Sequence, residues 1–520
     1  MTPPLITGLL KSNAYAHPAA ELRLIETHIS WVILAGEFAY KIKKPLELGF
    51  LDFSSLDKRQ HFCEEEIRLN RRLAPETYLA VVAIGGSIEM PIMETGMEAD
   101  TGPVLEWAVK MRAFPADATL DREAEIDHQQ IDAIAGAIAA FHASISIAPA
   151  ESAFGEPAAV IEPVAINFTQ LAALLQPAKS DPIIQQLARL QAWSHSEGER
   201  LTPHFAARKA GGFIRECHGD LHLSNIAWVD SAPLIFDALE FNPALRHIDV
   251  ANEIAFLTMD LRHRGREDLA WRLLNAYLDL TGDIAGLAAL PYYQVYRAMV
   301  RTKVSAILAT ANDQTAKPDF SETLTYLNLA DRLAHDRRPA LVLMHGVSGS
   351  GKTWLSQHLL EQLGGIRLRS DVTRKRLFGL QPLQNSSAIP GGIYTREASA
   401  RTLTTLLNDT RSVLNAGLLC IVDATFIHRT WRAPFQALAE ELNVAWHIVA
   451  VEAQPELLQA RITQRQQIGA DASEANHAVL ASQLANLEPF SSDENAHVVR
   501  LGEGWTAMDA VDRLRAIMLA

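Results

Sequence analysis

The chain has 520 residues, and its 48% hydrophobic and 21% charged content is typical of a globular protein rather than a disordered one. This length exceeds one ordinary hydrophobic core, so we expect two to four domains. A formal net charge of -14 argues against a general nucleic-acid binder or a binder of anionic membranes, although a local basic groove is compatible with it.

The first region of the sequence mixes strand and helix patterns. Residues 28–44 are rich in β-branched and aromatic side chains on both sides of Ala35-Gly36-Glu37, which is typical of a β-hairpin. Residues 57–74 alternate charged side chains with apolar ones at helical spacing, so they predict a helix. Further along, the pattern predicts a strand at 104–114, several helices, a short strand at 233–241 and mainly helices from about 246 to 335.

A charged cluster that ends in Pro339 indicates a domain boundary, because proline disfavours helix for the residue before it. We expect a first domain at 1–330, a linker at 331–338 and a second domain at 339–520. The second domain begins with an apolar strand, a glycine-rich loop and a helix, and two further strands are predicted at 418–426 and 445–453. Such alternation predicts an α/β fold with a mostly parallel sheet covered by helices.

The glycine-rich loop, GVSGSGKT at residues 346–353, matches the phosphate-binding pattern G-x-x-x-x-G-K-[ST]. Its glycines let backbone N–H groups turn towards an anion, and the following helix presents its positive N-terminus to phosphates. Lys352 would reach the β- and γ-phosphates of ATP and assist catalysis, and Thr353 would hold Mg²⁺. The predicted nucleotide-binding residues are Gly346, Ser348, Gly349, Ser350, Gly351, Lys352 and Thr353.

Two aspartates are candidates for chemistry beside this loop. Asp423 ends the apolar run LLCIV, where a carboxylate suits a Mg²⁺ partner, and a helix cap or turn is the alternative. Asp371 follows a predicted strand, where it would accept a proton from a substrate hydroxyl. Nearby cations would stabilise the phosphate charge. The alternative is that they form a solvated basic helix face. These cations are Arg367, Arg369, Arg374, Lys375 and Arg376.

Arg461 and Arg465 are four residues apart, hence on one face of a predicted helix. A closing lid would use such a pair to neutralise the transferring phosphoryl group, and a plain surface pair is the alternative.

Together these motifs make residues 339–500 resemble the P-loop kinases related to gluconate kinase, zeta-toxin-type kinases and polynucleotide 5′-kinases. The resemblance rests on GVSGSGKT, RSDVTRKRL, IVDATF and ARITQR. It implies ATP and Mg²⁺ as cofactors, and it does not extend to the acceptor.

The first half contains a second phosphoryl-transfer pattern, CHGDLHLSN at residues 217–225. The spacing from Asp220 to Asn225 equals that of the kinase catalytic loop. Asp220 would orient and accept the proton of the attacking hydroxyl, and Asn225 would ligate Mg²⁺. Asp237, after the apolar run PLIF, would be the main Mg²⁺ ligand.

Upstream, Lys41 and Lys43 alternate onto one face of a predicted strand, and one of them should contact the α- and β-phosphates. We expect Lys41, with Lys43 as the alternative. Glu66 is the expected carboxylate partner among three consecutive glutamates, because Leu69 and Leu73 follow it at helical spacing.

These motifs, over residues 25–260, resemble the aminoglycoside-phosphotransferase and choline-kinase-like family. The resemblance implies an α+β protein-kinase-like fold with a small β-rich lobe and a helical lobe. No G-x-G-x-x-G precedes Lys41; THISWV stands there instead, with Ser30 as a candidate phosphate contact. Acidic residues of the kind that bind drugs in such enzymes could equally be structural here; they are Glu240, Asp249 and Glu253.

The whole chain resembles a recurrent bacterial fusion of these two kinase types. We therefore expect a cytoplasmic bifunctional phosphotransferase that moves the γ-phosphate of ATP to small-molecule hydroxyls, with no membrane partner. Two alternatives stay open: the P-loop half phosphorylates nucleic-acid 5′-hydroxyls, or one half is an ATP-binding regulatory module. No signal peptide is expected. We expect the apolar stretch 131–148 to be a buried helix, and the three scattered cysteines to be reduced thiols of a cytosolic protein.

Overall fold

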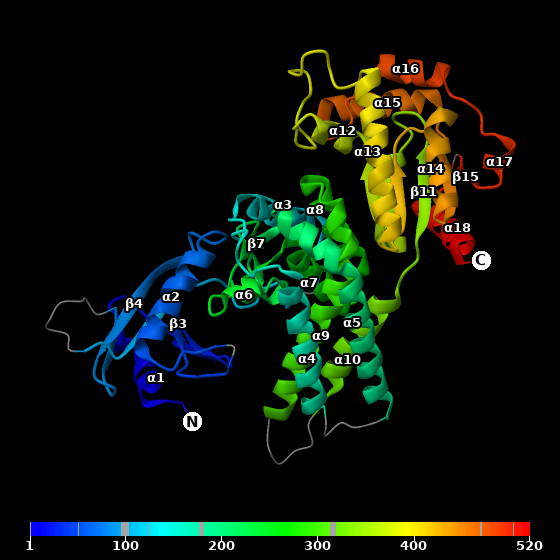
Figure 1. Ribbon diagram of the computed structural model, residues 1–520. Coiled ribbons are helices and arrows are strands. Elements are labelled where there is room, and N and C mark those ends of the chain that lie inside the picture. The colour runs from blue at the N-terminus through cyan, green and yellow to red at the C-terminus, as the bar shows by residue number, and fades with distance from the viewer. Residues whose placement is uncertain are drawn as a thin grey trace. The chain divides into compact units, whose positions relative to one another are not determined.

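The structure is a computed structural model (Figure 1) that describes residues 2–49, 51–94, 103–123, 125–175, 181–311, 319–468, 471–502 and 504–519. The chain divides into two compact units. Unit 1 comprises residues 1–133, 140–156 and 208–253, and unit 2 comprises residues 134–139, 157–207 and 254–520. The predicted division at 331–338 does not coincide with these units and stays a prediction.

Unit 1 is built on a six-stranded antiparallel sheet with the order β1-β2-β3-β6-β4-β5. The strands are β1 (Arg23–Glu26), β2 (Ser30–Ala35), β3 (Phe38–Lys43), β4 (Tyr78–Gly86), β5 (Pro91–Met93) and β6 (Glu106–Arg112). β2 and β3 form the predicted hairpin, with Ala35 paired to Phe38 across the Gly36-Glu37 turn. Its remaining elements are α1 (Pro4–Leu9), α2 (Leu56–Asn70), β7 (Ile214–Glu216), β8 (Ile226–Val229), β9 (Ala232–Ile235), α6 (Pro243–Arg246) and β10 (His247–Asp249).

Helix α2 packs against β4 and β6 of this sheet. It begins after Ser55, whose hydroxyl accepts a hydrogen bond from Lys58 N at 3.3 Å. The residues Cys63, Glu66 and Ile67 are buried at positions i, i+3 and i+4 of one face. This face explains why the third of the three consecutive glutamates, and not the first two, points into the protein.

The predicted strand at 233–241 is too long. β9 ends at Ile235, and Asp237 has a backbone φ of +64°, a left-handed conformation that a strand cannot contain. The apolar run PLIF predicts the strand correctly, but the residues after it form a turn that redirects Asp237.

Unit 2 contains a group of long helices. They are α4 (Pro157–Leu174), α5 (Asp181–Ala210), α8 (Glu267–Thr281), α9 (Leu290–Ala311) and α10 (Ser321–His335), while α3 (His128–Ser144), α5 and α7 (Val250–His263) contribute residues to both units. By length and composition α4 could span a membrane, the one such helix in the described ranges. It packs against α9, and its Val164, Phe168 and Leu171 are buried. The apolar stretch 131–148 is helical through Ser144 and mostly buried, as predicted.

Unit 2 also contains a five-stranded parallel sheet with the order β12-β13-β11-β14-β15. Its strands are β11 (Ala340–His345), β12 (Ile366–Arg369), β13 (Cys420–Asp423), β14 (Ala445–Val451) and β15 (Val498–Leu501). The helices around it are α11 (Lys352–Leu359), α12 (Ser370–Leu377), α13 (Arg396–Asn415), α14 (Arg429–Glu441), α15 (Pro455–Ile468), α16 (His477–Ala485), α17 (Ser492–Asn495) and α18 (Ala507–Leu519). Every residue of the central strand β11 is buried, which is the pattern of a strand covered on both faces.

Helix α8 contacts the edge strand β12 within unit 2. The side chain of Asn275 accepts a hydrogen bond from Arg367 N at 2.7 Å and donates one to Gly365 O at 2.8 Å. One asparagine thereby pairs backbone groups that the edge of a sheet leaves open. Both fold classes expected from the sequence, α+β in the first half and α/β in the second, are confirmed.

Candidate active sites

Two lysines of β3 and three carboxylates from other elements form one charge cluster in unit 1. Lys41 Nζ lies 2.9 Å from Glu66 Oε1 and also contacts Asp237. Lys43 Nζ lies 2.7 Å from Glu66 Oε2 and also contacts Glu240. Glu66 therefore uses one oxygen for each lysine. Lys43 is fully buried, whereas Lys41 reaches Asp237, whose side chain is 42% exposed.

The members of this cluster stabilise one another's charges. Burial opposes the charge on Lys43, but Glu240 and Glu66 outweigh it and raise the lysine's pKa above its usual value. Burial likewise opposes the charge on Glu66, but Lys41 and Lys43 lower its pKa to about 2. Burial raises the pKa of Glu240 despite the nearby lysine. Glu240 thus takes up a proton more readily than Glu66 does.

The loop at 217–225 places its two predicted functional groups side by side. Asn225 Nδ2 donates hydrogen bonds to Asp220 O at 2.9 Å and to Asp220 Oδ2 at 3.3 Å. His218 is fully buried, and its Nε2 lies 2.8 Å from Phe236 O. Burial lowers the pKa of His218, so the neutral ring donates to that carbonyl. The Asp220 side chain remains 42% exposed, and its Oδ2 lies 3.3 Å from His222 Nε2.

The backbone of Phe236 joins this loop to Asp237. Its N–H donates to Asn225 O at 3.0 Å, and its carbonyl accepts from His218. Asp237 N donates to the Tyr78 hydroxyl at 3.0 Å. Lys41, Asp237 and the Asp220 loop are consequently connected through direct contacts, although they are far apart in the sequence.

Glycine is required at the position where the protein-kinase loop has arginine. Gly219 has a φ of +87°, and a Cβ there would lie 3.0 Å from Leu245 O. Its N–H donates to Glu253 Oε1 at 2.7 Å. This departure from the protein-kinase pattern follows from the path of the backbone.

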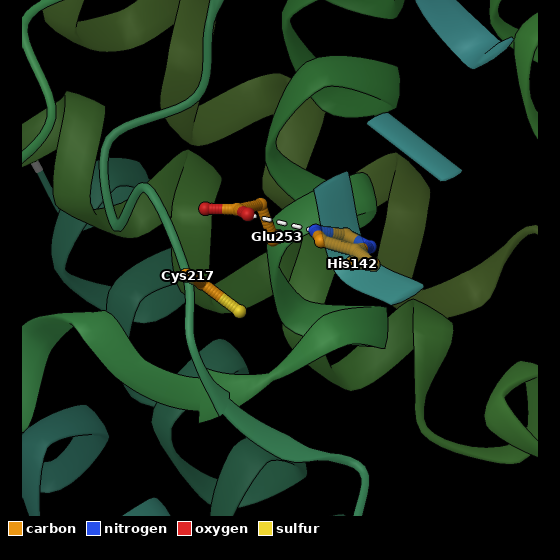
Figure 2. Close-up of side chains that lie close together, drawn as sticks. All are labelled: His142, Cys217 and Glu253. Carbon is orange, nitrogen blue, oxygen red and sulfur yellow. Dashed lines mark hydrogen bonds and ion pairs between the residues drawn. The ribbon is translucent and has the colours of Figure 1, made fainter. Parts of the chain in front are cut away.

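The buried side chains of Glu253, His142 and Cys217, the first residue of this loop, lie close together (Figure 2). Glu253 Oε2 lies 2.8 Å from His142 Nε2, so the carboxylate binds the histidine with one oxygen and Gly219 with the other. The three side chains have ligand atoms within 4.8 Å of one another, a spacing that would fit a metal ion. Burial raises the pKa of the Cys217 thiol well above its usual value, which disfavours the thiolate that a metal requires. The group is better explained as an anchor for the loop.

The other acidic candidates of the first half also have structural partners. Asp249 Oδ1 lies 2.6 Å from Arg208 Nη2, and both side chains are buried. Glu240 contacts Lys43 as described. Ser30 is fully buried, and its N–H donates to Thr27 Oγ1 at 2.9 Å. Its role as a phosphate contact stays a prediction.

In unit 2 the glycine-rich loop connects the end of β11 to α11 and lines a pocket of about 220 Å³. Gly349 has a φ of +84°, and a Cβ there would lie 2.8 Å from Leu458 O of α15. No other residue fits this position without movement of the loop or of α15. The predicted residues that line this pocket are Ser348, Gly349, Gly351, Lys352 and Thr353, whereas Gly346 and Ser350 belong to the same loop and are not part of the lining.

Lys352 is buried and forms no ion pair among the described residues, although Asp423 and Asp371 lie near enough to favour its charge. Its Nζ donates to Val347 O at 2.9 Å, and burial lowers its pKa to about 8. Asp423, at the end of β13, lines the same pocket and accepts a hydrogen bond from Ser356 Oγ at 3.2 Å.

Asp371 lies in the first turn of α12 and lines the same pocket. Burial raises its pKa, and the side chain of Ser473 hydrogen-bonds to it. A carboxylate with a raised pKa is a better proton acceptor than an ordinary one.

The two arginines of α15 both line this pocket beside the glycine-rich loop. Arg461 Nη1 donates to Gly349 O at 3.2 Å and to Ser350 O at 3.0 Å. Arg465 Nη2 donates to Ala475 O at 2.6 Å. The predicted pair thus lies on the side of α15 that faces the glycine-rich loop.

Most cations of the 367–376 cluster are paired within the protein. Arg367 and Arg369 each lie 3.7 Å from Asp279 Oδ2 of α8. Arg369 is also 3.3 Å from Asp471, Lys375 is 3.2 Å from Glu474, and Arg376 is 3.6 Å from Asp409. The cluster is therefore not a free basic patch.

Sequence reasoning missed one contributor to these sites. Gln483 Oε1 of α16 accepts a hydrogen bond from Ser348 N at 2.7 Å, and nothing in the sequence near Gln483 indicates this contact. For Glu240 and Glu253 the sequence leaves open whether they bind a drug-like substrate or are structural. Both have partners within the protein: Glu253 accepts a hydrogen bond from Gly219 N, and Glu240 contacts Lys43.

A protein-family model matches the part of the chain that contains the glycine-rich loop. Residues 341–490 match the family model described as an AAA domain, and they include the glycine-rich loop, Asp371, Asp423 and both arginines of α15. The expected P-loop domain is confirmed.

The similarity to other chains extends over both halves. An uncharacterized protein of Mycobacterium tuberculosis is 29% identical over 479 residues, which cover 91% of this chain and 92% of that protein, and the same values hold for one of Mycobacterium bovis. Among solved structures, a sugar kinase of Janibacter is 22% identical, with a TM-score of 0.27, over 34% of this chain and 92% of its own. A choline/ethanolamine kinase family protein of Mesorhizobium loti is 12% identical, with a TM-score of 0.38, over 62% of this chain and 90% of its own.

Proposed function

We propose that the chain is an ATP-dependent phosphotransferase with two separate sites, each moving the γ-phosphate of ATP to a hydroxyl of a small molecule. The best support is that each half of the chain has its own set of the lysine and carboxylate groups that phosphoryl transfer requires. Unit 1 joins Lys41 to Glu66 and Asp237 beside the Asp220 loop. Unit 2 gathers Lys352, Asp371 and Asp423 around one pocket.

In the first site, Lys41 would contact the nucleotide phosphates, and Glu66 would hold the lysine in place. Asp237 and Asn225 offer carboxylate and amide oxygens, which are the ligands that Mg²⁺ prefers. Bound Mg²⁺ would neutralise the phosphate charge. Asp220 would orient the acceptor hydroxyl and take its proton.

In the second site, the backbone N–H groups of the glycine-rich loop and the N-terminus of α11 suit phosphate. Thr353 and Asp423 would hold Mg²⁺, Lys352 would bind the β- and γ-phosphates, and Asp371 would take the acceptor's proton. Arg461 and Arg465 would neutralise the transferring group, as α15 already contacts the loop.

We further assign the first site to a domain at 1–330 and the second to one at 339–520. The three cysteines, Cys63, Cys217 and Cys420, are all free and buried, which supports a cytoplasmic location. A nucleic-acid 5′-kinase is less well supported, because its motivating cations are mostly paired with Asp279, Asp471, Glu474 and Asp409. A regulatory role for one half is opposed by the full set of reactive groups in each.

The test is transfer of an isotope-labelled γ-phosphate into a small-molecule extract, followed by mass spectrometry. Wild type is compared with Asp220→Asn, which changes the first site, and Lys352→Met, which changes the second. We expect each variant to lose a different labelled product. Loss of the same product from both, or of none from either, would refute two independent kinase sites. Labelled 5′-hydroxyl RNA and DNA oligomers test the nucleic-acid alternative, for which we expect no transfer.

A further inference from the structure

A second, larger chamber of about 760 Å³ adjoins the pocket beside the glycine-rich loop of unit 2. The smaller pocket is called the phosphate pocket below, after its proposed ligand. Ligand pockets generally measure about 300–1,000 Å³, so the chamber has room for much more than a phosphoryl group. Its wall comes from α12, α13, α16, the segment 386–394 and the residues that follow β13.

The chamber and the phosphate pocket meet at Asp371. Both cavities are lined by Ser370, Asp371, Thr425 and Ser473. An acceptor in the chamber would therefore place one hydroxyl at the proton acceptor and beside the γ-phosphate, while the rest of the molecule fills the chamber.

The charged groups of the chamber wall are largely satisfied by the protein. Glu474 accepts from Ser386 N at 2.9 Å and pairs with Lys375. His428 Nδ1 lies 3.1 Å from Glu488 Oε1. Arg374 Nη1 donates to Ile393 O and to Ser399 Oγ, each at 3.2 Å. Arg374 forms no ion pair among the described residues, and its buried Nε has no hydrogen-bond partner there, so this wall keeps one cation that no carboxylate contacts.

The wall also presents aromatic and apolar surface. Tyr394 lines the chamber and is 51% exposed, and the Arg374 guanidinium lies 5.0 Å from the centre of its ring. This cation fixes the tyrosine ring from one side. Trp431, packed edge-on to His428 at 5.3 Å, is a second aromatic side chain of the same wall. Leu403 and Leu406 of α13 and Val479 of α16 add apolar surface.

From these features we propose that the P-loop half phosphorylates an alcohol that bears a planar ring, with the ring held in this chamber against Tyr394. The inference rests on the proposed kinase function of this half and adds the class of its acceptor. The acceptor oxygen forms the new bond to the γ-phosphorus as the bond from that phosphorus to the β–γ bridging oxygen breaks. ADP leaves with the bridging oxygen, and the hydroxyl proton passes to Asp371.

The test uses the full chain and matched probes that differ in one group. Phenyl β-D-glucoside bears the ring, and methyl β-D-glucoside lacks it. Binding is measured by ligand-observed NMR without nucleotide, so the result does not depend on turnover. We expect the phenyl glucoside to bind about 3–10-fold more tightly than the methyl glucoside, as one aromatic contact allows.

Variants locate the ring on the protein. Tyr394→Ala should abolish the preference for the phenyl glucoside, and Tyr394→Phe should keep it, because stacking needs the ring and not the hydroxyl. Leu383→Ala is the control, since Leu383 is 62% exposed shortly before the segment 386–394 and does not line the chamber. Equal binding of the two probes, or a preference that survives Tyr394→Ala, would overturn the proposal. Failure of kinase activity itself would appear separately, as absence of phosphate transfer with the ring preference intact.

Discussion

The structure distinguishes the surroundings of two lysines, of which the sequence favours Lys41 as the phosphate contact and leaves Lys43 as the alternative. Lys43 is fully buried between Glu66 and Glu240, whereas Lys41 contacts the partly exposed Asp237. We therefore predict that Lys43→Met mainly lowers stability and that Lys41→Met mainly lowers activity.

The size of the stability effect follows from the carboxyl that Lys43→Met leaves unpaired. Glu240 would then avoid a buried charge by taking up a proton. For a carboxyl with an ordinary pKa of 4.5, that costs about 3.4 kcal/mol at pH 7, at about 1.36 kcal/mol per pH unit. Burial already raises the pKa of Glu240, so this cost is an upper limit. It corresponds to a fall in Tm of at most roughly 7–14 °C for a domain of this size.

Lys41→Met should cost less stability, because Asp237 can be hydrated and Glu66 keeps Lys43. Its effect should fall on phosphate transfer from the first site, by about 100–1,000-fold, as for other groups that stabilise developing charge. Scanning calorimetry and labelled phosphate transfer measure the two quantities on the same samples. The double change Lys43→Met with Glu240→Gln should restore most of the lost stability, since no unpaired charge then remains.

The opposite pattern would refute this reasoning. If Lys43→Met unfolds at the wild-type temperature and loses transfer, while Lys41→Met keeps transfer, then Lys43 is the phosphate ligand and the buried cluster does not have the energetics described.

Three further predictions concern the remaining groups. Binding of Mg²⁺-ATP to the P-loop site should take up close to one proton at pH 9 and almost none at pH 7. The reason is that Lys352, with a pKa of about 8, is neutral at pH 9 and becomes charged beside phosphate. Calorimetry in buffers of different ionisation heat measures this proton uptake, and Lys352→Met should abolish it. Contacts with a buried histidine and with a loop N–H outweigh burial and lower the pKa of Glu253. Its stabilising contribution is therefore present above pH 4.5 and is lost as the pH falls through the lower folded-state pKa. Glu253→Gln should remove this part of the acid unfolding curve, and an unchanged curve would contradict the prediction. Gly349→Ala should weaken nucleotide binding at least tenfold. The alanine Cβ would meet Leu458 O at 2.8 Å, and a positive φ alone costs about 1–2 kcal/mol. The control variant Gly502→Ala should bind nucleotide normally, because the space around Gly502 is open.

Much of this architecture follows from local signals in the sequence. The alternation around Gly36 fixes a hairpin, and the apolar run before residue 346 fixes the central strand of the parallel sheet. The spacing from Asp220 to Asn225 indicates the pair that the structure joins by a hydrogen bond. These features depend on neighbours in the chain, so pattern and propensity predict them.

Other features depend on contacts between distant segments. The strand predicted over 233–241 stops early because Tyr78, on β4, binds the backbone of Asp237. The cations around Asp371 look like a basic patch until Asp279, nearly a hundred residues earlier, pairs with two of them. The contact of Gln483 with the glycine-rich loop arises only when α16 packs beside it. A single sequence contains no local trace of such pairings.

The central claim is that one chain has two independent nucleotide sites, and counting bound nucleotides tests it most directly. Equilibrium dialysis with Mg²⁺ and a non-hydrolysable ATP analogue should give two nucleotides per chain for wild type. It should give one for Asp237→Asn, one for Lys352→Met, and none for the double variant. A wild-type value of one, or a single variant that removes both nucleotides, would contradict the account.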